Sequence, residues 1–156
     1  FNNEISIGES TVNTNNHIVN AIINTKLGEA KRKGIKTFCN TIRNINTNDI
    51  ADIDICNLLG NMLDNAIEAT EMCGETETKY IEINISINGE MLIISVKNSY
   101  NPKNSSIDLQ TNKHNKEHHG FGTKSIKKIA SKYNGEADFY NENGMFCCNV
   151  YLQISM

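Results

Sequence analysis

The chain has 156 residues, a formal net charge of −3 at pH 7 and 38% hydrophobic residues, a balance that suits one compact domain with its own core. The acidic balance argues against a dedicated nucleic-acid-binding protein, which normally carries a broad basic surface. No apolar run approaches the ~18 residues of a membrane span, and the first residues form no secretory signal. We expect this piece to be soluble, and its start at Phe1 is compatible with a larger parent protein.

The first sixteen residues are polar and show no sustained hydrophobic period. We interpret residues 1–16 as a leader or the end of a linker, and residues 17–156 as the domain. A helix is predicted from about residue 17 to residue 33, because apolar residues recur there at helical spacing. Asn15 or Asn16 can cap the start of this helix.

Seven further elements are predicted from hydrophobic periodicity and turn signals. The clearest is the strand over 81–87, where isoleucines alternate with polar residues, and Asn88-Gly89 predicts a hairpin turn after it. The seven elements are a strand over 35–42, a helix over 52–73, strands over 81–87 and 91–97, a helix opened by Gly120-Phe121-Gly122 that ends at Asn134-Gly135, and strands over 136–140 and 145–154. The predicted fold class is α+β, a two-layer α/β sandwich in which three helices cover one face of a mixed, mostly antiparallel sheet.

Residues 98–119 form a polar segment of about 20 residues, and compact domains seldom carry so long a loop without a functional reason. Between residues 111 and 132 there are six lysines and one acidic residue, Glu117. This basic cluster on an acidic protein suggests a small anionic ligand rather than a polymer. The alternative is a solvated, lysine-rich helix, and charge alone favours that alternative.

The helix over 52–73 carries a stripe of short polar side chains at helical spacing, Asn57, Asn61, Asn65 and Glu68. Short oxygen-bearing side chains on a rigid helix suit a hard cation such as Mg²⁺, with substrate phosphates as further ligands. The alternative is an ordinary exposed face in a protein that contains 25 asparagines.

Gly120-Phe121-Gly122 opens the helix that follows the polar loop. Free backbone N–H groups and the positive end of the helix dipole at such a start favour a bound phosphate. A Gly-x-Gly pair alone is weak evidence, but this one adjoins both the basic cluster and a loop long enough to fold over a ligand.

Four segments taken in order resemble the Bergerat-fold, or GHKL, ATP-binding domain. They are the asparagine-stripe helix, the strand end Ser95–Asn98, the polar loop and the segment His119–Ile126. The segments Leu63–Ala69 and Lys132–Glu136 look most similar to peptide quorum-sensing kinases of the AgrC/VirS type, and Ile22–Leu27 resembles the first helix of that subfamily. The resemblance covers about residues 15–154.

This resemblance implies ATP and Mg²⁺ as cofactors, with Asn61, Asn65 and Lys113 as the catalytic residues. Asn65 matches the asparagine that binds Mg²⁺ beside the phosphates and is the implied metal ligand. Asn61 lies where ATP-hydrolysing relatives carry a glutamate that acts as general base. Because an amide cannot take a proton from water, this difference favours phosphotransfer over hydrolysis. Lys113 matches a lid lysine that would reach the phosphates.

Asn98 matches the position of an aspartate that accepts a hydrogen bond from the adenine amine in most of the superfamily. Its neutral oxygen should bind adenine more weakly than a carboxylate would. The glycine-rich run after that aspartate is missing here, and His118 replaces the first glycine of the second glycine motif. The implied ATP-contacting residues are Asn61, Asn65, Glu68, Asn98, Lys113, His119, Gly120, Phe121, Gly122 and Thr123.

The function implied is that of the ATP-binding catalytic domain of a two-component sensor histidine kinase. Such a domain transfers the γ-phosphate of ATP to a histidine in a separate dimerisation domain, which passes it to a response regulator. His17 is interpreted as a residue at the start of a helix, since no acidic residue follows it. We therefore expect the phosphoacceptor histidine to lie outside this chain.

The same resemblance implies a cytoplasmic domain of a membrane-anchored bacterial sensor kinase, with this fragment monomeric and no nucleic acid as partner. Two alternative functions stay open. One is a serine kinase of the anti-sigma type on the same fold. The other is a degenerate GHKL module that acts by protein contact alone.

Overall fold

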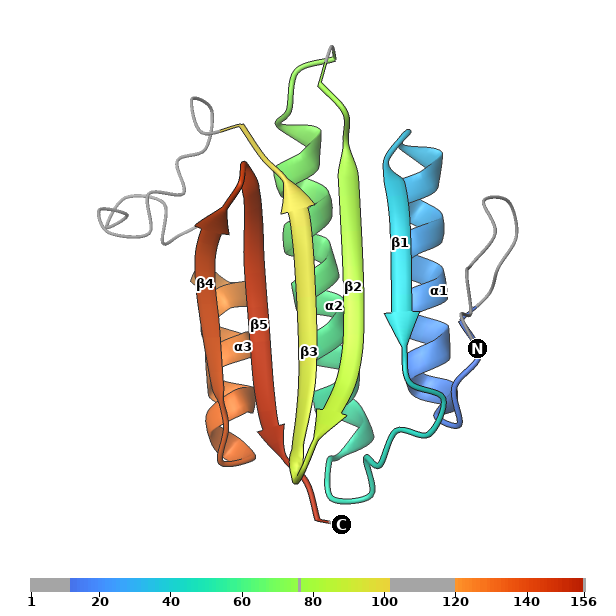
Figure 1. Ribbon diagram of the computed structural model, residues 1–156, viewed down its shortest axis with the longest axis vertical. Coiled ribbons are helices and arrows are strands. Elements are labelled where there is room, and N and C mark those ends of the chain that lie inside the picture. Colours follow the sequence, from blue (N-terminus) through green and yellow to red (C-terminus); the bar gives the residue numbers. More distant parts are fainter. Residues whose placement is uncertain (1–11, 76, 102–119, 156) are drawn as a thin grey trace.

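The computed structural model describes residues 12–75, 77–101 and 120–155 (Figure 1). Each predicted helix and strand is present, with ends shifted by one or two residues. In chain order the elements are α1 (His17–Arg32), β1 (Lys36–Thr41), α2 (Asp52–Glu71), β2 (Tyr80–Asn88), β3 (Met91–Ser99), α3 (Gly120–Lys132), β4 (Glu136–Glu142) and β5 (Met145–Gln153).

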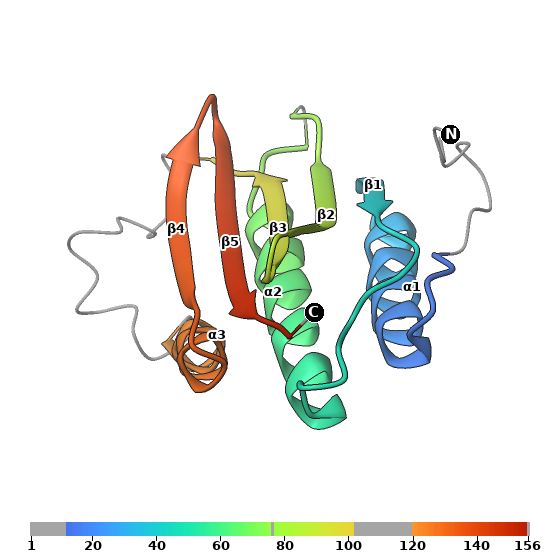
Figure 2. The ribbon, with the colours of Figure 1, turned by 60° about the horizontal axis from the view of Figure 1, so that its bottom comes forward.

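The five strands form one sheet in the order β1-β2-β3-β5-β4. β1 runs parallel to β2, and the other neighbouring strands are antiparallel. All three helices lie on the same face of this sheet, as the two ribbon views show (Figures 1 and 2). The predicted α+β sandwich with a mixed, mostly antiparallel sheet is therefore confirmed.

The core lies between the sheet and the three helices. In β2, Ile81, Ile83 and Ile85 face the helices and are at most 3% exposed, while the residues between them face the other way. Only one face of β2 is therefore buried, as the alternation of apolar and polar residues predicted, and burial of that face removes apolar surface from water. From α2, Leu59 and Leu63 close the core, each at most 1% exposed.

The central helix α2 packs between α1 and α3. Lys26 of α1 pairs with Asp64 at 2.7 Å, and Lys33 pairs with Glu71 at 2.5 Å. Lys33 directly follows α1, and the two pairs are seven residues apart in both segments, so α1 and α2 run parallel. Their side chains are partly exposed, so the pairs fix the register of the helices more than they stabilise the fold.

The two hairpin turns differ in how well the sequence predicted them. In the β4–β5 hairpin, Asn143 and Gly144 have φ of 53° and 77° and form the predicted turn. In the β2–β3 hairpin, Asn88 is paired with Met91, so the turn residues are Gly89 and Glu90 rather than Asn88-Gly89. Gly89 has φ of 61° and takes the first turn position, where a positive φ is needed.

The described part of the predicted leader, residues 12–16, packs against α1. The side-chain oxygen of Asn16 accepts hydrogen bonds from the N–H groups of Ile18 and Val19 at 2.9 and 3.0 Å. Asn16 is thus the N-cap of α1, which confirms one of the two predicted caps, and His17 is the first helical residue as predicted. The domain boundary after residue 16 stays a prediction.

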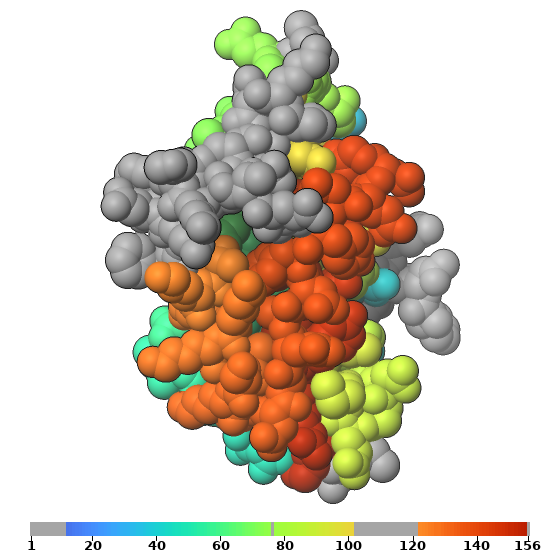
Figure 3. Space-filling view, turned by 90° about the vertical axis from the view of Figure 1, so that its left-hand side faces the viewer, coloured from blue at the N-terminus to red at the C-terminus, as the bar shows by residue number. Residues whose placement is uncertain are grey.

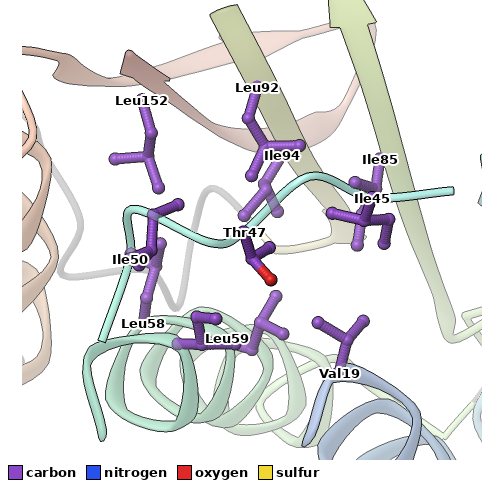
Figure 4. Close-up of a pocket in the computed structure, with 11 residues that line it drawn as sticks. Val19, Ile45, Thr47, Ile50, Leu58, Leu59, Ile85, Leu92, Ile94 and Leu152 are labelled. Carbon is purple, nitrogen blue, oxygen red and sulfur yellow. The ribbon is translucent and has the colours of Figure 1, made fainter. Parts of the chain in front are cut away.

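A void of about 10 Å³ lies in the core between the sheet, α1 and α2 (Figure 4). Ten of its eleven lining side chains are aliphatic, and the remaining one is Thr47. The hydroxyl oxygen of Thr47 accepts a hydrogen bond from Asn16 Nδ2 at 2.7 Å. A void of this volume is too small for a ligand, and its lining is almost entirely apolar. We therefore interpret it as a packing defect of the core.

Across residues 12–75, 77–101 and 120–155, no helix combines the length and the apolar character needed to cross a membrane.

Candidate functional site

The asparagine stripe lies on the face of α2 that points away from the sheet. Asn57 and Glu68 are exposed, whereas Asn61 and Asn65 are half-buried. Asp52 and Asp54 in the first turn complement the positive end of the helix dipole. The helix α2 packs against α1 and α3 on its two sides and against the sheet below, so the short amides are held on a rigid element.

Asn65 lies directly against the first turn of α3. A Cβ atom added to Gly122 would lie 3.0 Å from Asn65 Oδ1 and 3.3 Å from Asn65 Nδ2. Glycine permits this close approach, and the first turn of a helix offers N–H groups that no helical carbonyl satisfies. The structure thus brings the asparagine stripe and the glycine motif together, although they are far apart in the sequence.

The end of β3 lies at the same end of the domain as the C-terminal half of α2. The early α2 residues Leu58 and Leu59 line the same core void as Leu92 and Ile94 from the start of β3. α2 and β3 then run in the same direction (Figure 1). Seen from the side of α3, part of α2 is visible at the bottom of a hollow between α3 and the β4–β5 hairpin (Figure 3).

Asn98 occupies the penultimate position of β3 and is 2% exposed. It follows Leu92, Ile94 and Val96 on the buried face of the strand. Its Nδ2 donates a hydrogen bond to the carbonyl oxygen of Ser99 at 3.0 Å. The predicted adenine-binding side chain is therefore buried on the helix side of the sheet.

The remaining predicted site residues belong to the segment 113–123. Lys113 and His119 lie outside the described residues. Gly120 and Phe121 belong to the first turn of α3, and Thr123 in the same turn is half-buried. The roles assigned to all ten predicted ATP-contacting residues, to Lys113 in catalysis and to Asn65 as metal ligand stay predictions.

A polar cluster at the opposite end of the α2–α3 contact was not predicted from the sequence. Asp54 is only 9% exposed, and its Oδ2 lies 2.8 Å from Lys132 Nζ and 2.5 Å from the Tyr133 hydroxyl. The hydrogen bonds from Lys132 and Tyr133 lower the pKa of the Asp54 carboxyl, and that carboxylate raises the pKa of Lys132. The Tyr133 oxygen also accepts from the N–H of Ala51 at 3.0 Å.

This cluster fixes the C-terminal end of α3 to the start of α2. Because the contact between Gly122 and Asn65 lies at the other end of α3, the two helices run antiparallel. The register of α3 along α2 is thereby set at both ends. In the sequence, Lys132 belongs to the basic cluster of residues 111–132, and Lys132 and Tyr133 both belong to the segment of family resemblance. Nothing in a single sequence relates the end of one helix to the start of another.

The profile of the GHKL domain family matches residues 50–153, about two thirds of the chain. The chain belongs to the GHKL domain family. This match includes α2, the whole of β2 and β3, α3 and the β4–β5 hairpin. The helix α1 and β1 precede it. A comparison with curated protein sequences found no match.

Solved structures of histidine kinases share the fold of this GHKL domain. The catalytic domain of the histidine kinase ThkA, in a nucleotide-free form, superposes with a TM-score of 0.64 at 19% identity, over 87% of this chain and 90% of that chain. The histidine kinase AdeS from Acinetobacter baumannii gives a TM-score of 0.63 at 11% identity, over 89% and 64% of the two chains. The histidine kinase domain of the blue-light-activated kinase EL346 from Erythrobacter litoralis gives 0.62 at 12%, over 96% and 67%.

These low identities establish the fold alone. The predicted GHKL fold is confirmed, and it is the fold of histidine kinase catalytic domains.

Proposed function

We propose that this GHKL domain is the ATP-binding catalytic domain of a two-component sensor histidine kinase. It binds ATP with Mg²⁺ and transfers the γ-phosphate to a histidine in a separate dimerisation domain. The observation that carries this proposal is the contact between Asn65 and the first turn of α3. There, an amide oxygen, which is a suitable ligand for a hard cation, lies beside a helix N-terminus, which is a suitable site for phosphate.

Different groups of this site would hold Mg²⁺ and the phosphates of ATP. The amide oxygen of Asn65 would hold Mg²⁺, and the N–H groups at the start of α3 would hold phosphate oxygens. Mg²⁺, when bound, neutralises negative charge on the phosphates. The domain itself would contribute mainly the positioning of the γ-phosphate, because phosphoryl transfer demands little covalent chemistry from the protein. Asn98 would accept a hydrogen bond from adenine.

The first test concerns turnover by this chain alone. We expect it to bind ATP, to hydrolyse ATP very slowly and to acquire no label from γ-labelled ATP. Asn61 cannot act as the general base for water, and such a base typically contributes about 10²–10⁴-fold in rate. Adding a helical domain with the acceptor histidine of the parent should give acid-labile phosphorylation in trans, though slowly, because the tether is lost.

The matched variant for this test is Asn61→Glu, which supplies a carboxylate at the position in question. At saturating ATP, its hydrolysis should exceed that of the native chain. Rapid phosphate release from the native chain would instead place the protein among the hydrolases. Acid-labile label on His17 would show that the domain boundary is wrong.

A second test concerns the lid. We expect Lys113→Ala to weaken ATP binding more than adenosine binding, because a lysine at this position interacts with phosphate charge. Lys116→Ala, three residues further along the same segment, is the matched control and should change the two affinities little. Equal weakening of ATP and adenosine by Lys113→Ala would remove that lysine from the phosphate site.

Two other functions are separated by simple measurements. A degenerate module that acts by protein contact alone is favoured by the neutral side chain of Asn98 and by the missing glycines after it. Calorimetry with ATP and Mg²⁺ decides this, since no heat and no thermal shift would leave only that function. A serine kinase of the anti-sigma type is disfavoured by the amide at position 61, and phosphorylation of an acceptor histidine domain would argue against it.

We further propose that the parent is a membrane-anchored sensor of the AgrC/VirS type, with this domain in the cytoplasm and a response regulator downstream. The support is the similarity of Leu63–Ala69 and Lys132–Glu136 to that subfamily. The fragment itself is proposed to be monomeric, because the dimer interface would lie in the dimerisation domain.

A further inference from the structure

Two asparagines of α1 bind the backbone of the segment that precedes the helix. Asn24 Oδ1 accepts from the N–H of Val12 at 2.7 Å, and Asn24 Nδ2 donates to the Val12 carbonyl at 3.1 Å. One helical turn earlier, Asn20 Oδ1 accepts from the N–H of Thr14 at 2.8 Å, and its Nδ2 donates to the Thr14 carbonyl at 3.0 Å. Each amide therefore pairs with both polar groups of one residue.

The spacing of these pairs has a geometric reason. Four residues of α-helix rise by about 6 Å, and two residues of extended chain advance by about 6.6 Å. Asparagines four apart on a helix can thus meet every second residue of an extended segment. A primary amide carries one acceptor and a pair of donor hydrogens, as a peptide unit carries an acceptor and a donor, so Asn20 and Asn24 can each pair with a backbone unit. Asn20 Oδ1 also accepts from the Thr14 hydroxyl at 2.7 Å, whereas Oδ1 and Nδ2 of Asn24 both pair with backbone atoms of Val12.

The bound segment is also tied to the chain between β1 and α2. The N–H of Asn15 donates to the carbonyl of Arg43 at 2.9 Å, and Asn15 Oδ1 accepts from the N–H of Ile45 at 2.9 Å. Val12 and Thr14 are only 7% and 6% exposed. Residues 12–16, called here the strap, are therefore held against α1 and against the connection between β1 and α2.

The strap runs antiparallel to α1, because Thr14 lies beside Asn20 and Val12 beside Asn24. Asn24 is halfway along α1, and α1 lies on the flank of the domain opposite α3 (Figures 1 and 2). Since α1 is parallel to α2, the strap leads back from Thr14 to Val12 toward the end of the domain that holds the Asn65–Gly122 contact.

We propose that Asn20 and Asn24 form a clasp for extended backbone, whose occupant is the strap, and that this clasp fixes where the preceding part of the parent protein is tethered. A domain attached before Val12 is then held at the middle of α1 rather than at the helix start. That the attached domain is a phosphoacceptor domain rests on the proposed function, whereas the binding of the strap by Asn20 and Asn24 does not.

The test is amide hydrogen exchange on the 156-residue chain. In the double variant Asn20→Ala/Asn24→Ala, the amides of Val12 and Thr14 should exchange at least about tenfold faster, because each loses its acceptor. Amides in the centre of β3 should be unchanged. Thr25→Ala, on the exposed side of the same helix, is the matched control and should leave the strap protected.

A second variant guards against a general loss of structure. Asn24→Asp keeps the shape and the acceptor for the Val12 N–H, but it places a carboxylate oxygen against the Val12 carbonyl in place of a donor. Exchange at Val12 should rise more than exchange at Thr14. The proposal is overturned if Val12 and Thr14 exchange in the native chain as fast as in an unstructured peptide, or if the double variant leaves their rates unchanged.

Nucleotide binding separates this proposal from the function. The double variant should bind ATP with Mg²⁺ within about twofold of the native chain, because the clasp is on α1 and α2 separates that helix from α3 (Figure 2). Loss of ATP binding confined to the double variant would contradict that separation and make the strap part of the nucleotide site. Absence of ATP binding in both chains would count against the proposed function and leave the exchange result standing.

Discussion

Replacing Gly135 with alanine should strongly destabilise the domain. Gly135 lies between α3 and β4, where its backbone passes against β5. A Cβ atom here would lie 1.6 Å from the carbonyl oxygen and 2.7 Å from the carbonyl carbon of Tyr151. Both are backbone atoms of a paired strand, so no side-chain rotation can relieve the clash. We expect a cost above about 3 kcal/mol, against a typical total stability of about 5–15 kcal/mol.

The measurement is urea denaturation of the variant and of a matched control. Gly60→Ala is that control, because a Cβ at this α2 position would have no heavy atom within 4 Å. Alanine there should be neutral or should stabilise the helix by up to about 1 kcal/mol. A stability of Gly135→Ala within about 1 kcal/mol of the native chain would show that β5 can move away from this glycine.

Asn65→Ala should abolish the tightening of nucleotide binding by Mg²⁺. Asn65 is the proposed protein ligand of the cation, and its side chain lies against the first turn of α3. Loss of a contact to a charged group costs about 1.5–3 kcal/mol, which corresponds to about 10–100-fold in affinity. Calorimetry with ATP, in the presence and absence of Mg²⁺, measures the difference directly.

Two further variants make this result specific. Asn57→Ala removes an exposed asparagine two turns earlier in the same stripe and should leave the Mg²⁺ dependence intact. Gly122→Ala should weaken nucleotide binding to a lesser degree, because its Cβ would press on Asn65 Oδ1 from 3.0 Å. Retention of full Mg²⁺ dependence in Asn65→Ala would refute the assignment of the cation to this asparagine.

The elements of the fold were predictable because each depends on local periodicity. The isoleucines of β2 alternate with polar residues, and the strand is buried on the predicted face. The apolar residues of α2 recur at helical spacing, and the polar stripe lies outward as expected. The β2–β3 turn was displaced by one residue, because both Asn88-Gly89 and Gly89-Glu90 satisfy turn chemistry and only strand pairing selects between them.

The candidate site was predictable in its parts but not in its assembly. Asn65 and Gly122 each stood out by residue type and context, whereas their contact depends on how α3 packs along α2. Asp54 and the Lys132–Tyr133 pair set that register, and each looks like an ordinary helix-end residue when taken alone.

The sequence by itself determined the helices, the strands and the residue types at the site, since hydrophobic periodicity and turn chemistry act over a few neighbouring residues. The tertiary structure alone decided which distant residues meet. It placed the backbone of β5 against Gly135. It also placed Val12 and Thr14 beside Asn20 and Asn24, two residues that nothing in the sequence distinguishes from the other asparagines among the 25. Such contacts arise from the packing of whole elements, and a residue's own neighbourhood in the sequence carries no record of them.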